Sequence, residues 1–355
     1  MINVLVTGAC GVTSRSVVRS LKLSSFFRDK LNFIGTDVCY NLYGVYEGLY
    51  SRIYNVPSYK DLEYRKIMKD IIDKEKVEYA IVIPEPEVLY WSENPFNVKF
   101  HRIPQKFAKN VLSKYRLYSL LKDSHIIPKF QLVDKNTCEK DIELDYPLWI
   151  RDYSEGTTSG MGSFAPANFE QLQAWLIINK DCKNFMLSEY LPGRNLACFL
   201  LYDEGKLIKY GVAERQKYIM SKVSVSKITG NTSQGKLLNY DEAFHIANEA
   251  VNIISKKVDE ALNGLVVVDL KEDKYGCPKV TEINIRHVAF TSSFAMAGLN
   301  FAEAQLFILM GCKEKISKNQ TFFFPENNLV LRDVDGLPIY VPEFKDCKKG
   351  NFYET

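Results

Sequence analysis

The sequence lacks the clustered cysteines that would indicate a disulfide framework or a zinc site. Its eight cysteines are spread singly along 355 residues, with no Cys-x-x-Cys spacing, at positions 10, 39, 138, 182, 198, 277, 312 and 347. Small secreted domains depend on cysteine pairs, and zinc sites need ligands that lie close together. We therefore expect reduced thiols, as in the cytoplasm.

Long apolar runs, a strong net charge and histidines are also scarce. No apolar stretch approaches the ~18 residues that cross a bilayer, and the opening run Met1–Val6 is short and has no basic leader. The net charge of +3 is small for this length and gives no reason to expect a nucleic-acid or anionic-membrane partner. None of the four histidines is an obvious catalytic base. The sequence thus predicts a soluble, cytoplasmic protein.

Strand-like and helix-like segments alternate over the first hundred residues. Apolar, β-branched runs at Ile2–Thr7, Asn32–Asp37 and Tyr79–Ile83 predict strands. Helical spacing of the apolar side chains at Ser14–Leu23 and Tyr64–Lys74 predicts helices between them. This alternation is typical of an α/β, Rossmann-like unit, in which a parallel sheet forms a crevice at the carboxyl ends of its strands.

A glycine turn, Gly8-Ala9-Cys10-Gly11, joins the first of these strands to the first helix, and Asp37 ends the next strand. The context suits a dinucleotide phosphate on the helix N-terminus, but glycine turns alone specify little. A short-chain dehydrogenase would also need a Tyr-x-x-x-Lys pair, and that spacing occurs here about as often as chance gives. We interpret the turn as a tight strand-to-helix connection.

The rest of the chain predicts a second, larger unit that begins at Pro128, after a long amphipathic helix at Phe107–Lys122. The loop Ser154–Ser163 is rich in glycine and hydroxyl side chains. Further helices are expected at Phe169–Asn179, Asp241–Leu262 and Phe301–Met310, and strands at Pro147–Asp152, Phe185–Leu191, Leu196–Tyr202, Lys206–Ala213, Leu265–Leu270 and Lys279–Ile285. The final forty residues contain short strand-like pieces to which the sequence assigns no role.

The strongest chemical signal lies on the last two of these strands. Asp269 stands among large apolar neighbours, and Glu282 and Asn284 are two residues apart, so their side chains share one face. A hairpin would bring all three together, and Mg²⁺ prefers such oxygen ligands, which it usually links to substrate phosphates. Neighbouring carboxylates repel unless a cation lies between them. Arg286 follows directly and suits a transferred phosphoryl group; the alternative for the acids is an exposed sheet face.

At this point the sequence resembles the ATP-grasp family, and within it the large subunit of carbamoyl-phosphate synthetase and its stand-alone relatives. Their signature ends in Glu-Ile-Asn-Pro-Arg, and this sequence has Glu282-Ile283-Asn284-Ile285-Arg286 after its glycine turn. Ala297-Gly298-Leu299-Asn300 resembles the Ala-Gly-x-Asn that follows in those proteins. The likeness covers about residues 110 to 312.

The resemblance implies a domain order. A Rossmann-like pre-ATP-grasp domain at 1–108 would precede a two-lobed, α+β ATP-grasp domain at 109–315. The lid subdomain would cover about 128–190, and 316–355 would be an extension.

The resemblance also implies the other parts of an ATP site. Asn195 stands where the family usually has an acid for the ribose hydroxyls; an amide can still bind a hydroxyl but adds no charge. Arg215 matches a basic residue that holds substrate or phosphate, although it could equally be a surface charge. The remaining nucleotide residues would be Lys114 and Arg151 near the phosphates, Ser154, Gly156, Ser159 and Gly160 in the lid loop, and Glu189, Tyr190 and Leu191 at the adenine hinge.

The implied reaction is ATP-dependent ligation. Asp269, Glu282 and Asn284 would hold Mg²⁺, with Mn²⁺ as an alternative, and Arg286 and Arg215 would be catalytic. A small-molecule carboxylate would become an acyl phosphate, which an amine then attacks to form an amide. The alternatives are a kinase or carboxylating variant and a non-catalytic nucleotide-sensing protein; a homodimer is left open. Candidates for the acceptor side are Glu85, Glu87, Trp91, His287 and Thr291, and a polar loop is as good an interpretation of the two glutamates.

Overall fold

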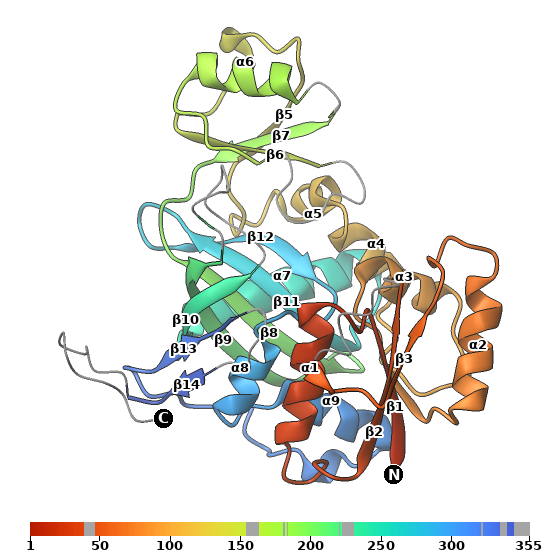
Figure 1. Ribbon diagram of the computed structural model, residues 1–355. Coiled ribbons are helices and arrows are strands. Elements are labelled where there is room, and N and C mark those ends of the chain that lie inside the picture. The colour runs from red at the N-terminus through yellow and green to blue at the C-terminus, as the bar shows by residue number, and fades with distance from the viewer. Residues whose placement is uncertain are drawn as a thin grey trace.

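The computed structural model describes residues 1–38, 47–153, 163–179, 182, 184–219, 221, 231–320, 322–333 and 339–343. The strands of this part of the chain form three sheets, which Figure 1 shows as a small lobe at the top, a large central sheet and a separate sheet beside it. The first sheet is parallel and the other two are antiparallel, which confirms the mixed α/β class predicted from the sequence. No helix in the described ranges is long and apolar enough to cross a membrane.

The first sheet has the strand order β3-β2-β1-β4. Its strands are β1 (Ile2–Thr7), β2 (Leu31–Asp37), β3 (Arg52–Asn55) and β4 (Tyr79–Ile81), and the helices between or after them are α1 (Val12–Leu23), α2 (Tyr64–Lys74) and α3 (Glu85–Glu93). Both faces are covered, so apolar side chains of the central strands pack on both sides of the sheet. Val4 and Val6 pack with α1, whereas Leu5 and Ile34 pack with α2.

The turn after β1 is as tight as the sequence predicts. Gly8 has a φ of +63°, and a Cβ at this position would lie 2.9 Å from Cγ of Pro84, just before α3. Only glycine combines that backbone conformation with so close an approach. The turn therefore brings the beginnings of α1 and α3 together at one edge of the first sheet.

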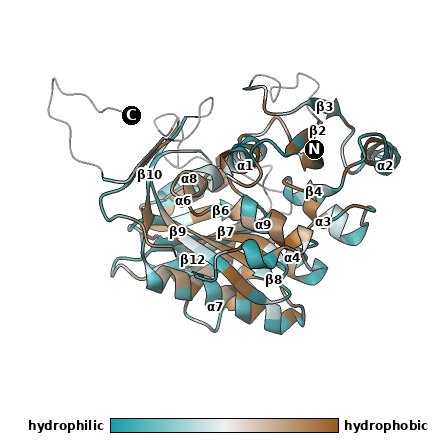
Figure 2. Ribbon diagram, turned by 90° about the horizontal axis from the view of Figure 1, so that it is seen from below, coloured by the Kyte–Doolittle hydropathy of each residue, from teal (hydrophilic) through white to brown (hydrophobic). Residues whose placement is uncertain are grey.

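The large sheet has the strand order β12-β11-β8-β9-β10-β13-β14. Its strands are β8 (Asn195–Asp203), β9 (Lys206–Tyr218), β10 (Thr232–Leu238), β11 (Gly264–Glu272), β12 (Pro278–Asn284), β13 (Leu329–Leu331) and β14 (Ile339–Val341). Along β8, Cys198 faces α7 (Asp241–Val258), while Phe199 faces α8 (Thr291–Met296) and α9 (Phe301–Met310). In Figure 2 the hydrophobic colour is concentrated on these strands, and α7 lies beside them.

A small antiparallel sheet, with the order β5-β7-β6, forms the upper lobe in Figure 1. It consists of β5 (Phe130–Val133), β6 (Leu148–Asp152) and β7 (Phe185–Glu189), with α6 (Phe169–Ile178) on one face and the short turn η2 (Glu139–Asp141) at its side. Ile150 and Leu187 pack against Leu172 of α6, which gives the lobe its own small core.

The helix predicted at Phe107–Lys122 is two helices, so this prediction was wrong. α4 (Gln105–Val111) ends at Val111, and α5 (Lys114–Leu121) begins three residues later, at Lys114. Ser113 is the N-cap of α5, because its hydroxyl accepts a hydrogen bond from the backbone N–H of Arg116. The break places Lys114 at a helix start instead of in the middle of a helix.

Segments from the two ends of the chain pack together. Leu306 and Phe307 of α9 join the core of the first sheet, beside Val17 of α1. The hydroxyl of Ser16 donates to the carbonyl of Ala289 at 3.0 Å, just before α8. After α9 the chain passes through the turn η3 (Lys313–Lys315) and returns to the large sheet as β13 and β14.

Candidate active site

The hairpin of β11 and β12 brings the predicted acidic residues together. Asp269 pairs directly with Glu282, and Asn284 pairs with Val267 two positions along the same strands. Directly paired residues point to the same face of a sheet, so the two carboxylates are neighbours. Burial raises the pKa of Asp269, the charge of Arg215 opposes this, and the Glu282 carboxylate adds to it. A cation between the two acids would remove this repulsion.

Arg215, on β9, already supplies part of that positive charge. Its guanidinium binds both oxygens of Asp269, at 2.6 Å and 3.1 Å. Carboxylate oxygens have further lone pairs, so this ion pair leaves Asp269 able to accept a metal as well. In the described ranges no three His, Cys, Asp or Glu side chains are grouped as a metal site. The donor set that fits Mg²⁺ is two carboxylates and the amide oxygen of Asn284, completed by phosphate oxygens.

A second ionic group lies where the first sheet meets this hairpin. Glu85, at the start of α3, is 3.7 Å from Nε of Arg286. Burial raises the pKa of Glu85, the charges of Arg286 and Lys114 oppose this, and Glu282 adds to it. Arg286 is held further by a hydrogen bond that it donates to the carbonyl of His287, at 2.9 Å.

Arg151, at the end of β6, carries an unused hydrogen-bonding capacity. Only 7% of the residue is exposed. Its Nη1 donates to the carbonyl of Thr281 at 3.0 Å, and the guanidinium stacks over Tyr118, 4.8 Å from the ring centroid. Nε and Nη2 are buried and have no hydrogen-bond partner in the described part of the chain. Buried guanidinium nitrogens are costly unless an acceptor meets them, so this side chain suits a ligand anion.

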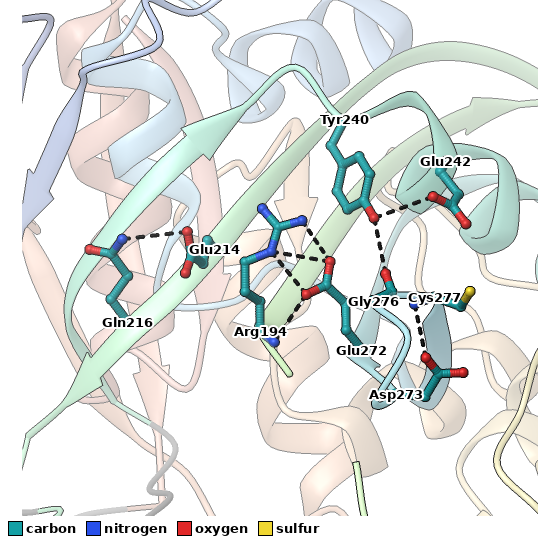
Figure 3. Close-up of polar contacts among 9 residues, drawn as sticks. All are labelled: Arg194, Glu214, Gln216, Tyr240, Glu242, Glu272, Asp273, Gly276 and Cys277. Atoms are coloured by element: carbon teal, nitrogen blue, oxygen red, sulfur yellow. Dashed lines mark hydrogen bonds and ion pairs between the residues drawn. The ribbon is translucent and has the colours of Figure 1, made fainter. Parts of the chain in front are cut away.

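The segment between β7 and β8 connects the upper lobe to the large sheet, and an ion pair anchors it. Figure 3 shows Arg194 and Glu272 facing each other, with Tyr240 alongside. Nη2 of Arg194 lies 2.6 Å from Oε1 of Glu272, and the backbone N–H groups of Gly193 and Arg194 donate to the carbonyl and carboxylate of Glu272. Glu189, Tyr190 and Leu191, which are predicted to form the adenine hinge, are therefore followed by a segment that is fixed to the large sheet.

Asn195, the residue expected to contact the ribose, accepts a hydrogen bond from a lysine. Nζ of Lys271 donates to the amide oxygen of Asn195 and to the carbonyl of Gly193, both at 3.2 Å. Burial lowers the pKa of this lysine. Because Lys271 follows Asp269 by two residues on β11, the two share a face, and the period of a strand could have revealed it.

One cleft of about 760 Å³ collects these groups. The cleft is lined by every residue predicted for the nucleotide, metal and catalytic site that the structure describes, namely Lys114, Arg151, Glu189, Tyr190, Leu191, Asn195, Arg215, Asp269, Glu282, Asn284 and Arg286. The lid-loop residues Ser154, Gly156, Ser159 and Gly160 lie outside the described residues. Residues that the sequence did not single out, Thr13 at the start of α1 and Tyr118, Tyr218 and Lys271, also line the cleft.

The five candidates for the acceptor side do not all line this cleft. Glu85 lines the cleft, but Glu87 and Trp91 belong to a buried network in the first sheet, where the Tyr64 hydroxyl donates to Glu87 at 2.7 Å and accepts from Trp91 at 2.9 Å. His287 and Thr291 are buried behind the cleft, where His287 also contacts Gln305. For four of the five candidates the expectation was wrong.

Comparisons with known proteins agree with this architecture. No protein-family model and no curated protein matches the sequence. Several solved structures cover 93% of this chain, and three of them are compared in turn. The L-amino acid ligase from Bacillus licheniformis is 14% identical, with a TM-score of 0.62 and 79% of its chain covered. The second is the biotin carboxylase domain of the Hydrogenobacter thermophilus 2-oxoglutarate carboxylase, solved with MgADP and bicarbonate. It is 15% identical, with a TM-score of 0.63 and 74% covered.

The third comparison decides the fold. A structure from Archaeoglobus fulgidus, described as an ATP-grasp superfamily protein, is 16% identical, with a TM-score of 0.56 and 92% of its chain covered. This chain has the ATP-grasp fold. In this ATP-grasp structure the cleft lies between the lobe of β5–β7 and the large sheet, since its lining residues come from both.

Proposed function

We propose that this chain is an ATP-dependent ligase that activates a small-molecule carboxylate as an acyl phosphate and joins it to an amine. The proposal is supported above all by one cleft in which two paired carboxylates, an amide oxygen and five basic side chains meet. The solved structures of similar fold that carry ligase or carboxylase names add support.

The nucleotide would lie across the cleft. The backbone of Glu189–Leu191 would hold the adenine, and Asn195 with Lys271 would meet the ribose. Nε and Nη2 of Arg151, which lack partners among the described groups, would donate to phosphate oxygens. Lys114 would add charge at the start of α5. Mg²⁺ held by Asp269, Glu282 and Asn284 would neutralise charge on the β- and γ-phosphates.

In the first step an oxygen of the substrate carboxylate attacks the γ-phosphorus, the bond to the ADP oxygen breaks, and an acyl phosphate forms. Arg286, positioned by Glu85, would stabilise the negative charge on the transferred group. In the second step the amine attacks the acyl carbon, the bond to phosphate oxygen breaks, and the nitrogen loses a proton. Binding and charge neutralisation supply most of such catalysis.

A carboxylating reaction is the second candidate, because one structure of similar fold was solved with MgADP and bicarbonate. There bicarbonate would be the carboxylate that accepts the phosphoryl group. ADP release with bicarbonate and no other acid separates this candidate from the ligase. A kinase would show phosphate transfer without amide formation. A nucleotide-sensing protein would bind Mg-ATP without turnover.

The proposal predicts ADP release in the presence of Mg-ATP and at least one acid–amine pair from a panel of amino acids and sugar acids. Glu282→Gln should reduce kcat at least a hundredfold and weaken Mg-ATP binding, because one charged ligand becomes neutral while the shape is kept. Glu249→Gln, on the exposed side of α7, is the matched control. Unchanged binding and turnover in Glu282→Gln would contradict the metal assignment.

A further inference from the structure

The last strands of the chain place an arginine beside the cleft. Gly235 of β10 pairs with Arg215 of β9 on one side and with Val330 of β13 on the other. Arg332 follows Val330 by two residues, so in extended backbone it points to the same face as Arg215. Gly235 lies between Arg215 and Val330 in the sheet. It has no side chain, so the space above it on this face is left open.

The ring of Phe290 forms the base of this space. A Cβ on Gly235 would lie 3.1 Å from Cζ of Phe290, and the Arg332 guanidinium carbon lies 5.6 Å from the centroid of the same ring. The Arg332 Nη1 also donates to the carbonyl of Thr232 at 2.8 Å. Asn231 and Ala289, the residues just before Thr232 and Phe290, both line the cleft. Arg332 therefore contacts the chain neighbours of two cleft-lining residues and is not itself one of the lining residues.

This end of the cleft carries more positive than negative charge. Arg215 is paired with Asp269, and Arg19 of α1 is paired with Glu47. Arg332 forms no ion pair with any acid in the described ranges. Burial, together with the like charges of Arg215 and Arg19, lowers the pKa of Arg332 to about 10. A partly buried cation among other cations is unfavourable until an anion joins it.

We propose that Arg332, assisted by Arg215, binds an anionic group of the second substrate, either a carboxylate or a phosphate ester that is separate from the group undergoing reaction. Guanidinium groups bind both kinds of anion through two parallel hydrogen bonds. The inference depends on the proposed function in one respect only, because it calls the bound anion a substrate. It narrows the acceptor to molecules that carry a second negative charge, and it gives the C-terminal segment that contains β13 a role in substrate binding.

Anion binding is tested without turnover. The protein is first saturated with Mg-ADP, which fills the nucleotide part of the cleft, and inorganic phosphate or succinate is then titrated by calorimetry. We expect saturable binding of at least one of the two, and at least tenfold weaker binding in Arg332→Gln. Arg332→Lys should bind severalfold more weakly than the original protein, since lysine keeps the charge but not the paired hydrogen bonds.

Arg28→Gln, which changes an exposed arginine at the surface, is the matched control and should bind like the original protein. Equal affinity in Arg332→Gln, or no binding of either anion to the original protein, would overturn the proposal. If Arg332→Gln does not fold, the anion affinity of Arg332→Lys is the test. An unchanged affinity in Arg332→Lys would contradict the two parallel hydrogen bonds that the proposal assigns to the guanidinium. The ratio of phosphate to succinate affinity tells which anion the site prefers. Failure of the ligase assay with normal anion binding would reject the proposed reaction but not this site.

Discussion

At the scale of single residues, the least expected feature is the buried, partly unsatisfied guanidinium of Arg151. A buried cation lowers stability unless its hydrogen-bonding groups are met. Nε and Nη2 have no partner among the described residues, while Nη1 and the ring of Tyr118 hold the side chain in place. This arrangement fits the proposed contact with a phosphate better than a contribution to folding.

Arg151→Met should therefore separate binding from stability. We expect the affinity for Mg-ATP to fall at least tenfold, since charge-assisted hydrogen bonds contribute ~1.5–3 kcal/mol each. The free energy of unfolding without nucleotide should change by no more than ~1 kcal/mol, because relief of burial offsets the lost bond to Thr281. Calorimetry with Mg-ATP and urea unfolding measure the two quantities. A large loss of stability with unchanged affinity would show that Arg151 is structural.

Sequence patterns located the acidic and basic residues of the cleft because period-2 spacing determines which side chains share a face. Asp269, Glu282 and Asn284 are of this kind. The same reasoning failed for Glu87 and Trp91, because which side of a short helix is buried depends on what packs against it. Here Tyr64, on a different helix, completes the buried network.

At the scale of elements, the hinge is stabilised by an ion pair that links two strands of the large sheet. Burial opposes ionisation of Glu272, but hydrogen bonds and the charge of Arg194 outweigh it, so the pKa of Glu272 lies below its usual value. A lowered pKa adds stability above the ordinary pKa of a glutamate and loses it as the pH falls through the folded-state value. The hinge should loosen in acid.

Glu272→Gln should reproduce that loosening at neutral pH. We expect a loss of ~1 kcal/mol in the free energy of unfolding, kept small because Arg194 is partly exposed, and a severalfold weaker affinity for Mg-ATP. Glu242→Gln is the control, since Glu242 lies beside the same tyrosine without an ion pair (Figure 3). An equal effect of both variants would contradict a special role for the pair.

Element boundaries were less predictable than element types. The helix at Tyr64–Lys74 and the strand at Ile2–Thr7 have the predicted bounds, because strong periodicity coincides there with clear ends. α7 ends at Val258, four residues before the predicted end, since Asp259 takes a left-handed conformation with a φ of +56°. β13 and β14 could not be identified with confidence from three apolar residues each, because their pairing depends on strands far away in sequence.

At the scale of the whole molecule, two histidines from distant parts of the sequence lie beside one small cavity and are kept neutral by burial. Burial lowers the pKa of His101 and of His287 to about 4. Both lie beside a cavity of about 20 Å³ that is also lined by Gln305. The ordinary pKa of histidine is ~6.5, so below that value the unfolded chain takes up protons that the folded chain excludes.

We therefore expect the free energy of unfolding to fall as the pH drops from ~6.5 toward 4, by up to ~1.4 kcal/mol per pH unit for each histidine. Urea unfolding at a series of pH values measures the slope. His101→Gln should reduce this slope by the amount that corresponds to about one proton taken up on unfolding. His245→Gln, on the exposed side of α7, should leave the slope unchanged. An identical slope in all three proteins would contradict the buried, neutral state.

The packing of α9 against the first sheet also affects how the protein is made. Leu306 and Phe307 belong to the same buried core as Val17 and Phe27. During translation Val17 and Phe27 leave the ribosome long before their covering helix exists, and at ~5–20 residues per second the interval is on the order of ten seconds or more. The apolar side chains that α9 covers in the folded protein therefore stay exposed until synthesis has passed Met310.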